Sequence, residues 1–147
     1  MNSRVDRTTG KYDDLCSSVK KDDIPCTDLV VDGFRYLIFP TITSCCMCCT
    51  VEQGCSILRP DWLVNSTFIG YNTTGSVKYQ IWDKKGFQDN YYWQVDATQV
   101  PYIIDQHPND IMVFNISTFS KTVDPSVFVL PSYCSKDHKC PPPSCDF

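Results

Sequence analysis

Cysteine is the residue that most constrains what this chain can fold into. Ten cysteines occur in 147 residues, and four of them share the run Cys45-Cys46-Met47-Cys48-Cys49. An even number at this density is typical of extracellular domains held by disulfides. Because adjacent side chains of an extended strand point to opposite faces, this one run can send bridges in four directions. We predict that all ten form disulfides, in a pairing that the sequence leaves open: Cys16, Cys26, Cys45, Cys46, Cys48, Cys49, Cys55, Cys134, Cys140 and Cys145.

The cysteine run also contains two overlapping C-x-x-C pairs, Cys45 with Cys48 and Cys46 with Cys49. Thiolates at this spacing bind zinc or an iron–sulfur cluster when a second such pair completes the ligand set, and the rest of the sequence offers none. A redox role requires a helix after the pair and a βαβ context, and the pattern predicts neither. We therefore expect no metal and no cofactor.

Groups suited to catalysis are few. The two histidines, His107 and His138, stand among turn-forming and charged residues, and no local signature makes Cys55 a nucleophile. The carboxylates are dispersed through turns and form no calcium-binding loop. We predict a protein that is not an enzyme and has no catalytic residues.

Three N-glycosylation sequons begin at Asn65, Asn72 and Asn115, and none has proline in the middle. Together with the cysteines they predict a secreted, extracellular glycoprotein. The residues after Met1 are polar, so we expect a signal peptide to have been removed or not included. The net charge of −4 argues against a nucleic-acid partner, and no apolar run approaches the roughly 18 residues of a membrane span.

The second half of the chain has the pattern of a β-meander. Short segments rich in β-branched and aromatic residues alternate there with turn-forming residues. The predicted strands are 66–71, 76–82, 90–96, 101–105 and 110–116. An additional strand is predicted over 34–39, and Asp124-Pro125 is typical of the start of a short helix.

These patterns predict a mainly β fold, with a strongly curved antiparallel sheet and short helical turns. We expect a single disulfide-stabilised domain over 1–147, with a meander core over 66–116 and a Pro/Cys-rich tail over 135–147. No cysteine lies within the meander. The bridges are therefore expected to fasten the N-terminal half and the tail onto a sheet that is nearly stable without them.

Aromatic side chains are concentrated on the predicted strands. Val77, Tyr79 and Ile81 share one face of their strand, and Lys78, Gln80 and Trp82 share the other. One face must form the core, whereas the concave face of a curved sheet can line a ligand cavity. Periodicity alone does not separate these two interpretations.

Short motifs along most of the chain are those of a known secreted family. In the second half they are Pro60-Asp61-Trp62, Phe68-Ile69-Gly70, Gly75, Trp82-Asp83, Gly86, Tyr91-Tyr92-Trp93, Pro101, Ile103, Met112-Val113-Phe114 and Phe128-Val129-Leu130-Pro131-Ser132-Tyr133-Cys134. In the first half they are Arg4-Val5-Asp6-Arg7, Asp32-Gly33, Tyr36 and the cysteine run before Gly54-Cys55. The chain resembles the ependymin-related proteins and their protist relatives, whose fold is similar to that of the bacterial LolA and LolB lipoprotein carriers.

The resemblance implies a LolA-like half-barrel with a hydrophobic concave pocket, secretion, N-glycosylation and binding of lipids, and it implies no catalytic residues. The cysteine run is denser than in the animal members, which marks a cysteine-rich, protist-type member. We predict a non-enzymatic glycoprotein that binds a hydrophobic small molecule or lipid. The candidate pocket residues are Tyr79, Ile81, Trp93, Ile103, Met112 and Phe114. The alternative is a structural subunit of an extracellular matrix or filament that self-associates into a polymer.

Overall fold

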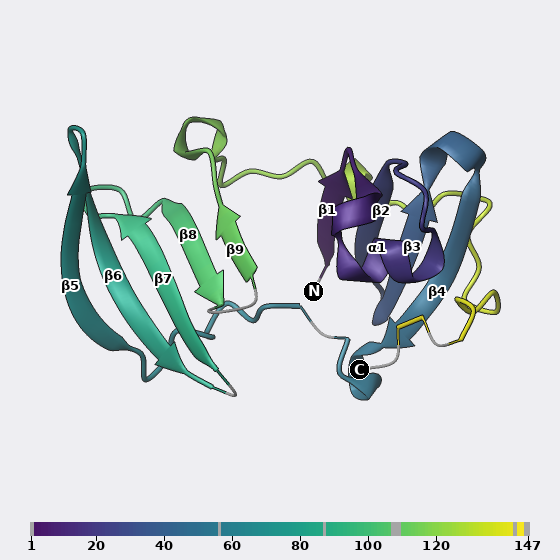
Figure 1. Ribbon diagram of the computed structural model, residues 1–147, viewed down its shortest axis with the longest axis horizontal. Helices are drawn as coiled ribbons and strands as arrows, with labels where there is room; N and C mark the ends of the chain where they lie inside the picture. The colour runs from purple at the N-terminus through teal and green to yellow at the C-terminus, as the bar shows by residue number, and fades with distance from the viewer. Residues whose placement is uncertain (1, 56, 87, 107–109, 143, 146–147) are drawn as a thin grey trace. The chain divides into compact units, whose positions relative to one another are not determined.

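The computed structural model describes residues 2–55, 57–86, 88–106, 110–142 and 144–145 (Figure 1). The fold is mainly β, as predicted: the described residues form two antiparallel sheets of four and five strands and one short α-helix. Among these residues, no helix is long and apolar enough to cross a membrane.

The chain divides into two compact units, where the sequence predicts a single domain. Unit 1 consists of Met1–Leu58 together with Val123–Phe147, and unit 2 consists of Arg59–Thr122. Unit 2 is therefore an insertion between the two halves of unit 1. All ten cysteines belong to unit 1 and none to unit 2.

Unit 1 is built on a four-stranded sheet of order β1-β2-β3-β4. The strands are β1 (Ser3–Arg7), β2 (Cys26–Val31), β3 (Phe34–Phe39) and β4 (Ser44–Thr50). Helix α1 (Asp14–Val19) begins at the N-cap Asp13, whose side chain accepts a hydrogen bond from the backbone N–H of Cys16. The 3₁₀ turns of this unit are Gly10–Tyr12, Pro40–Ile42, Val51–Gln53 and Pro125–Phe128, and the last has the predicted Asp124 as its N-cap.

Each face of the four-stranded sheet is covered by a different segment. Helix α1 packs over one face, where Leu15 and Val19 contact buried Leu37 and Phe39. The segment after unit 2 packs over the other face, where Phe128 and Leu130 contact a buried cluster around Leu29, Ile38 and Met47. The sheet therefore has a core on both sides.

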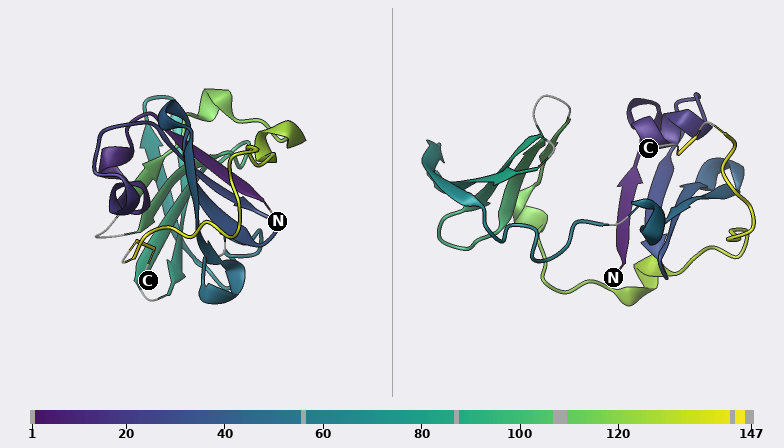
Figure 2. Two further views of the ribbon diagram at one scale, coloured as in Figure 1. Left: turned by 90° about the vertical axis from the view of Figure 1, so that its right-hand side faces the viewer. Right: turned by 90° about the horizontal axis from the view of Figure 1, so that it is seen from below.

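The C-terminal tail passes from one face of this sheet to the other around the edge of β4 (Figure 2). At the edge, the backbone N–H of Met47 donates to the carbonyl of His138, and the N–H of Cys140 donates to the carbonyl of Met47. Disulfides fix the tail on either side of this crossing, Cys45–Cys134 on one face and Cys46–Cys140 on the other. The tail thus occupies the edge at which the sheet would otherwise continue.

Unit 2 is the predicted meander, a five-stranded sheet in sequence order. Its strands are β5 (Thr67–Thr74), β6 (Val77–Lys85), β7 (Asp89–Val95), β8 (Pro101–Gln106) and β9 (Asp110–Val113), followed by a 3₁₀ turn at Ile116–Thr118. All five predicted strands are confirmed to within a few residues at each end, except that β9 ends before Phe114.

The strands form two antiparallel sheets where the sequence predicts one curved sheet, and the tail occupies the β4 edge of the first. One expectation, about the disulfides, is wrong. The disulfides do not fasten anything onto the meander: all five join residues within unit 1. The cysteines stabilise the unit that contains the N-terminal half, and the meander carries its own contacts.

Candidate functional site

The structure brings four of the six candidate pocket residues together on one face of the five-stranded sheet. Ile81 pairs with Trp93 and Trp93 pairs with Ile103, while Tyr79 stands two residues before Ile81 on the same strand. We call this face the Tyr79 face. Tyr79 is buried and stacks on the ring of Tyr102, with the centroids 4.3 Å apart.

The other two candidates do not join this group. Met112 pairs with Ile104, whose partner Tyr92 alternates with Trp93, so Met112 lies on the opposite face. Phe114 follows the end of β9, and both Met112 and Phe114 are exposed. The alternation within each strand is predictable, but the face of one strand relative to the next depends on register and on bulges.

Two cavities of about 300 Å³ are found in unit 1, and neither is lined by any of the six candidates. The first is polar and lies beside the disulfides of Cys140 and Cys145. The second, which we call the apolar groove, lies on the face of the four-stranded sheet that the segment after unit 2 covers. Its lining is Arg4, Asp6, Arg7, Thr8, Pro25, Thr27, Leu29, Ile38, Pro40, Val129, Pro131 and Tyr133.

The floor of the apolar groove comes from adjacent strands. Leu29 on β2 and Ile38 on β3 are 1% and 4% exposed. Val129 and Tyr133, on the segment after unit 2, are 68% and 39% exposed. A closed apolar floor below exposed apolar walls is the usual composition of a small ligand site.

Strand β1 supplies charged groups to the groove. The Arg4 guanidinium donates from Nε to the Asp6 carboxylate, with both oxygens 3.0 Å away, and donates from a terminal nitrogen to the carbonyl of Val127. Asp6 also accepts a hydrogen bond of 2.6 Å from the Thr27 hydroxyl. These charges are paired with one another, so the groove combines an apolar floor with polar groups on β1 that already have partners.

Both ends of the exposed wall are held in place. Cys134, next to Tyr133, is bonded to Cys45, and Cys45 pairs with Ile38 in the groove floor. At the other end, the Arg4 contact to Val127 ties the segment to β1. The groove is therefore assembled by residues more than a hundred positions apart and stapled by a disulfide, which no local pattern in the sequence could indicate.

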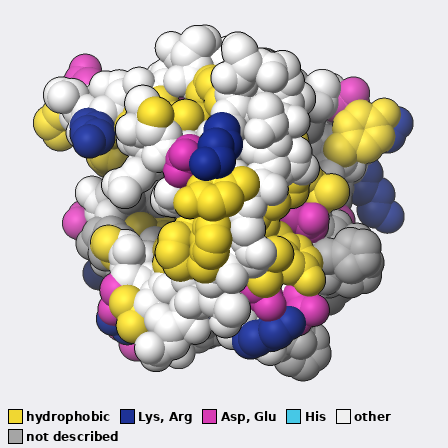
Figure 3. Space-filling model, turned by 90° about the vertical axis from the view of Figure 1, so that its left-hand side faces the viewer, with side chains coloured by type: hydrophobic (Ala, Val, Ile, Leu, Met, Phe, Trp, Pro, Cys, Tyr) yellow, Lys and Arg dark blue, Asp and Glu magenta, His cyan; other side chains and the backbone are white. Residues whose placement is uncertain are grey.

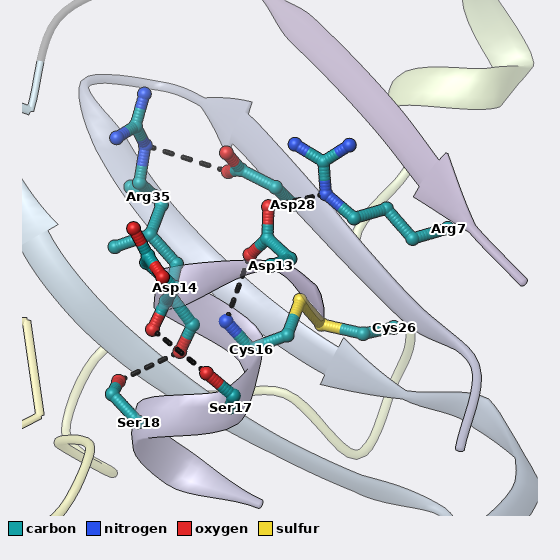
Figure 4. A network of polar contacts seen from close by, with 10 residues as sticks. Arg7, Asp13, Asp14, Cys16, Ser17, Ser18, Cys26, Asp28 and Arg35 are labelled. Carbon is teal, nitrogen blue, oxygen red and sulfur yellow. Dashed lines mark hydrogen bonds and ion pairs between the residues drawn. A yellow bond between two sulfur atoms is a disulfide. The ribbon is translucent and has the colours of Figure 1, made fainter. Parts of the chain in front are cut away.

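The opposite face of unit 1 carries a second polar cluster, in which Arg7, Asp13, Asp28 and Arg35 surround the start of α1 (Figure 4). Arg7 forms an ion pair with Asp13, and the Arg35 Nε lies 3.4 Å from an Asp28 oxygen. Burial raises the pKa of Asp28, and the neighbouring Arg35 opposes this shift. The cluster joins β1, β2, β3 and the helix start, so its role is structural.

The prediction for the cysteines is confirmed: all ten form disulfides. Each cysteine of the run has a different partner, since Cys45, Cys46, Cys48 and Cys49 bond to Cys134, Cys140, Cys145 and Cys55. Cys16 bonds to Cys26. The sulfurs of Cys48, Cys49 and Cys55 lie within 4.8 Å of one another, but each is oxidised and none is a thiolate that could bind a metal ion.

The sequon asparagines Asn65, Asn72 and Asn115 are all exposed. The Asn115 side chain accepts hydrogen bonds from the backbone N–H and the hydroxyl of Ser117 in its own sequon. His138 is exposed on the tail, and His107 lies outside the described residues.

The fold and the groove define a class: a mainly β protein with a disulfide-stapled unit, an inserted β-meander and a small apolar groove. Residues 32–134 match the model of a family described as a domain of unknown function, DUF8395, and the chain belongs to that family. Searches of curated proteins and of solved structures found no match. The resemblance to ependymin-related proteins remains a prediction.

Proposed function

We propose that this protein is a non-enzymatic, secreted glycoprotein that binds a small hydrophobic molecule, and that it does so in the apolar groove of unit 1. The observation that carries this proposal is the groove itself, with Leu29 and Ile38 as its floor and a disulfide-held wall. Its volume of about 300 Å³ is at the lower end of known ligand sites, so it suits an aliphatic chain or a single ring.

The binding energy would come from burying apolar surface. Each Å² of ligand removed from water contributes about 25 cal/mol, and the exposed Val129 and Tyr133 would lose their own contact with water in the same step. The disulfide limits the motion of the wall, so little ordering opposes binding. Arg4 and Asp6 on β1 satisfy each other's charge, which favours a ligand that carries no charge on the side facing them.

Secretion and glycosylation are part of the proposal. Five disulfides are typical of proteins that fold in an oxidising compartment, and the three sequon asparagines are exposed and so accessible to a transferase. Mass spectrometry of the secreted protein before and after glycosidase treatment tests both points. An unmodified mass for protein taken from the secretory pathway would contradict the glycoprotein assignment.

The ligand test is an NMR titration with decanoate, followed through the methyl signals of Leu29 and Ile38. We expect saturable shifts at both residues, and binding about ten-fold weaker in Val129→Asp, which places a charge in the wall. Val123→Asp is the matched control, because Val123 is also an exposed valine of the same unit and lies outside the groove lining. Shifts confined to Ile81 and Ile103 would move the site to the meander, and equal binding by both variants would exclude the groove.

A second candidate, self-association into a filament, is favoured by strand β9. This strand is the last of its sheet, and Ile111 and Val113 are 61% and 62% exposed on it. An apolar edge strand is a template for pairing with another chain. Sedimentation over a range of concentrations tests this candidate: Val113→Lys should abolish any polymer, and a monodisperse monomer at high concentration would exclude it.

A further inference from the structure

The face of the five-stranded sheet opposite Tyr79 carries exposed aromatic rings at one end. Phe68 and Tyr71 on β5 are 42% and 55% exposed, and Trp82 on β6 packs edge-on against Phe68. The ring centroids lie 5.1 Å apart for Phe68 and Tyr71 and 5.2 Å apart for Phe68 and Trp82. Figure 3, seen from the side on which β5 lies in Figure 1, shows hydrophobic side chains gathered in the middle of this face.

A chain of polar side chains borders the rings on the same face. Gln80 pairs with Tyr71 on one side and with Gln94 on the other. The Gln94 amide donates to the Gln80 carbonyl oxygen at 2.8 Å, and the Gln80 amide donates to an Asp96 oxygen at 2.7 Å. Gln80, Gln94 and Asp96 are all part-exposed, so each retains hydrogen-bonding capacity toward solvent.

The charges at this surface cancel. The Lys78 ammonium lies 3.3 Å from the second Asp96 oxygen and 3.6 Å above the ring of Tyr71. Lys78 therefore links the polar chain to the aromatic rings and neutralises the carboxylate. We name the seven residues the amide–aromatic surface: Phe68, Tyr71, Lys78, Gln80, Trp82, Gln94 and Asp96.

A β-bulge builds this surface. Phe68 and Tyr71 are three residues apart, a spacing that places side chains on opposite faces of a regular strand. The register of β5 shifts between Phe68 and Gly70, so that Phe68 pairs with Trp82 and Tyr71 with Gln80 on the same side. Gly70 has a φ of 150°, a conformation that side chains disfavour. Bulges re-aim side chains in this way at functional sites.

We propose that the amide–aromatic surface binds a neutral carbohydrate. A sugar ring has an apolar face of C–H groups and a rim of hydroxyls. The exposed rings of Tyr71 and Phe68 match the C–H face, and the glutamine amides and the Asp96 carboxylate match the hydroxyls, since an amide both donates and accepts. Exposed aromatic surface beside a few convergent polar groups fixes the orientation of a bound ring.

The same observations disfavour the other classes of occupant. An acyl chain needs enclosure, whereas Tyr71 and Phe68 lie on an open sheet face. An acidic polymer needs an excess of positive charge, and the one cation of this surface is paired with Asp96. The Asn72 sequon does not block the surface, because Asn72 pairs with Tyr79 and belongs to the other face. The site is separate from the apolar groove, since its residues belong to unit 2.

The test titrates the full-length protein with three neutral oligosaccharides, cellohexaose, laminarihexaose and maltohexaose, and follows tryptophan fluorescence and NMR. We expect saturable binding of at least one of them, with shifts at the side-chain amides of Gln80 and Gln94. Tyr71→Ala and Gln94→Ala should each weaken it about ten-fold. Tyr12→Ala, a change of an exposed tyrosine in unit 1, should have no effect. Affinity should also be independent of salt, because the ligand is uncharged.

Three results would overturn the proposal. One is the absence of saturation by any of the three sugars up to about 10 mM, ten-fold above a millimolar dissociation constant. Another is binding that Tyr71→Ala and Gln94→Ala leave unchanged. The third is affinity for a charged polymer such as heparin that exceeds the affinity for the neutral sugars and falls with salt. Circular dichroism of each variant separates a lost contact from a lost fold.

Discussion

The two units of this chain are stabilised by different kinds of interaction. Unit 1 holds its four-stranded sheet with five disulfides, three of which close loops of 89 to 97 residues. Unit 2 has no cysteine and relies on continuous neighbouring strands and on aromatic pairs such as Tyr79 with Tyr102. The difference follows from connectivity, because unit 1 is made of two segments that the insertion of unit 2 separates.

Chain entropy explains why the disulfides are where they are. Bringing the tail back to β4 across a loop that contains all of unit 2 costs more than pairing consecutive strands of a meander. Bridges that close long loops remove most of that cost from the unfolded state. The cysteines are therefore concentrated in the unit whose contacts are the most distant in sequence.

Reduction of the disulfides is expected to have the largest effect, because it acts on unit 1 alone. The three long-range bridges are nested, so the first one closed contributes about 4–5 kcal/mol and each further bridge adds less, a total comparable to the usual stability of a whole domain. We expect reductant to unfold unit 1 and leave unit 2 folded. The three tryptophans, Trp62, Trp82 and Trp93, all lie in unit 2 and report on it alone.

The measurement compares tryptophan emission with hydrogen exchange of peptides from β2 and β4 at increasing reductant. The emission should stay constant while the exchange protection of unit 1 is lost. A red shift of the emission at the same reductant concentration would mean that unit 2 depends on unit 1.

Bridges should differ in their effect according to the loop that they close. The long loop opens only when Cys45–Cys134, Cys46–Cys140 and Cys48–Cys145 are all removed, and replacing these six cysteines should cost at least about 4–5 kcal/mol. The matched change in Cys49–Cys55, which closes only 6 residues, should cost about 2 kcal/mol. Urea unfolding followed through the methyl signal of Leu37 gives both values. Equal costs would show that the bridges act through native contacts and not through the unfolded chain.

The strands of unit 2 could be predicted from the sequence because each depends on local alternation and on nearby turns. Val77, Tyr79 and Ile81 share a face as expected, and the cysteine run on β4 sends out its four bridges as expected. What could not be predicted depends on distant contacts. The tail reaches the edge of β4 from far along the chain, and the apolar groove needs β1, β2, β3 and the segment after unit 2 together.

The two proposed sites illustrate the same limit. The three-residue spacing of Phe68 and Tyr71 predicts that they lie on opposite faces of the strand. The bulge between Phe68 and Gly70 places them on the same face. Val129 and Tyr133 belong to the segment after unit 2. Nothing in their spacing indicates that they form the wall of the groove above Ile38. Register and long-range packing place these side chains, and neither is encoded within a window of a few residues.

Gly70→Ala tests whether the β5 bulge contributes to the stability of unit 2, the unit that has no disulfides. A φ of 150° is strained for alanine, so we expect a loss of about 1–2 kcal/mol in the stability of unit 2 and none in unit 1. Thr73→Ala on the same strand is the control for side-chain changes on β5. Urea unfolding followed by tryptophan emission measures unit 2, and an unchanged midpoint in Gly70→Ala would mean that the bulge is not needed for the sheet.

The smallest effect concerns the buried charges of unit 1. Burial raises the pKa of Asp28 above its ordinary value of 3.8, so the folded state holds its proton more tightly than the unfolded state does. The contribution of Asp28 to stability is therefore fully present below about pH 4 and is lost as the pH rises through the raised pKa. Between pH 4 and 6, the unfolding free energy of Asp28→Asn should fall less, or rise more, than that of the native chain. The difference between the two slopes should be smaller than the slope that one titrating proton produces.

Urea unfolding at each pH, followed by the methyl signals of Leu29 and Leu37, measures the slopes. Asp22→Asn removes the same charge from an exposed position of unit 1, so only a slope change confined to Asp28→Asn reports on the buried cluster. A steeper fall in Asp28→Asn would mean that the attraction of Arg35 outweighs burial.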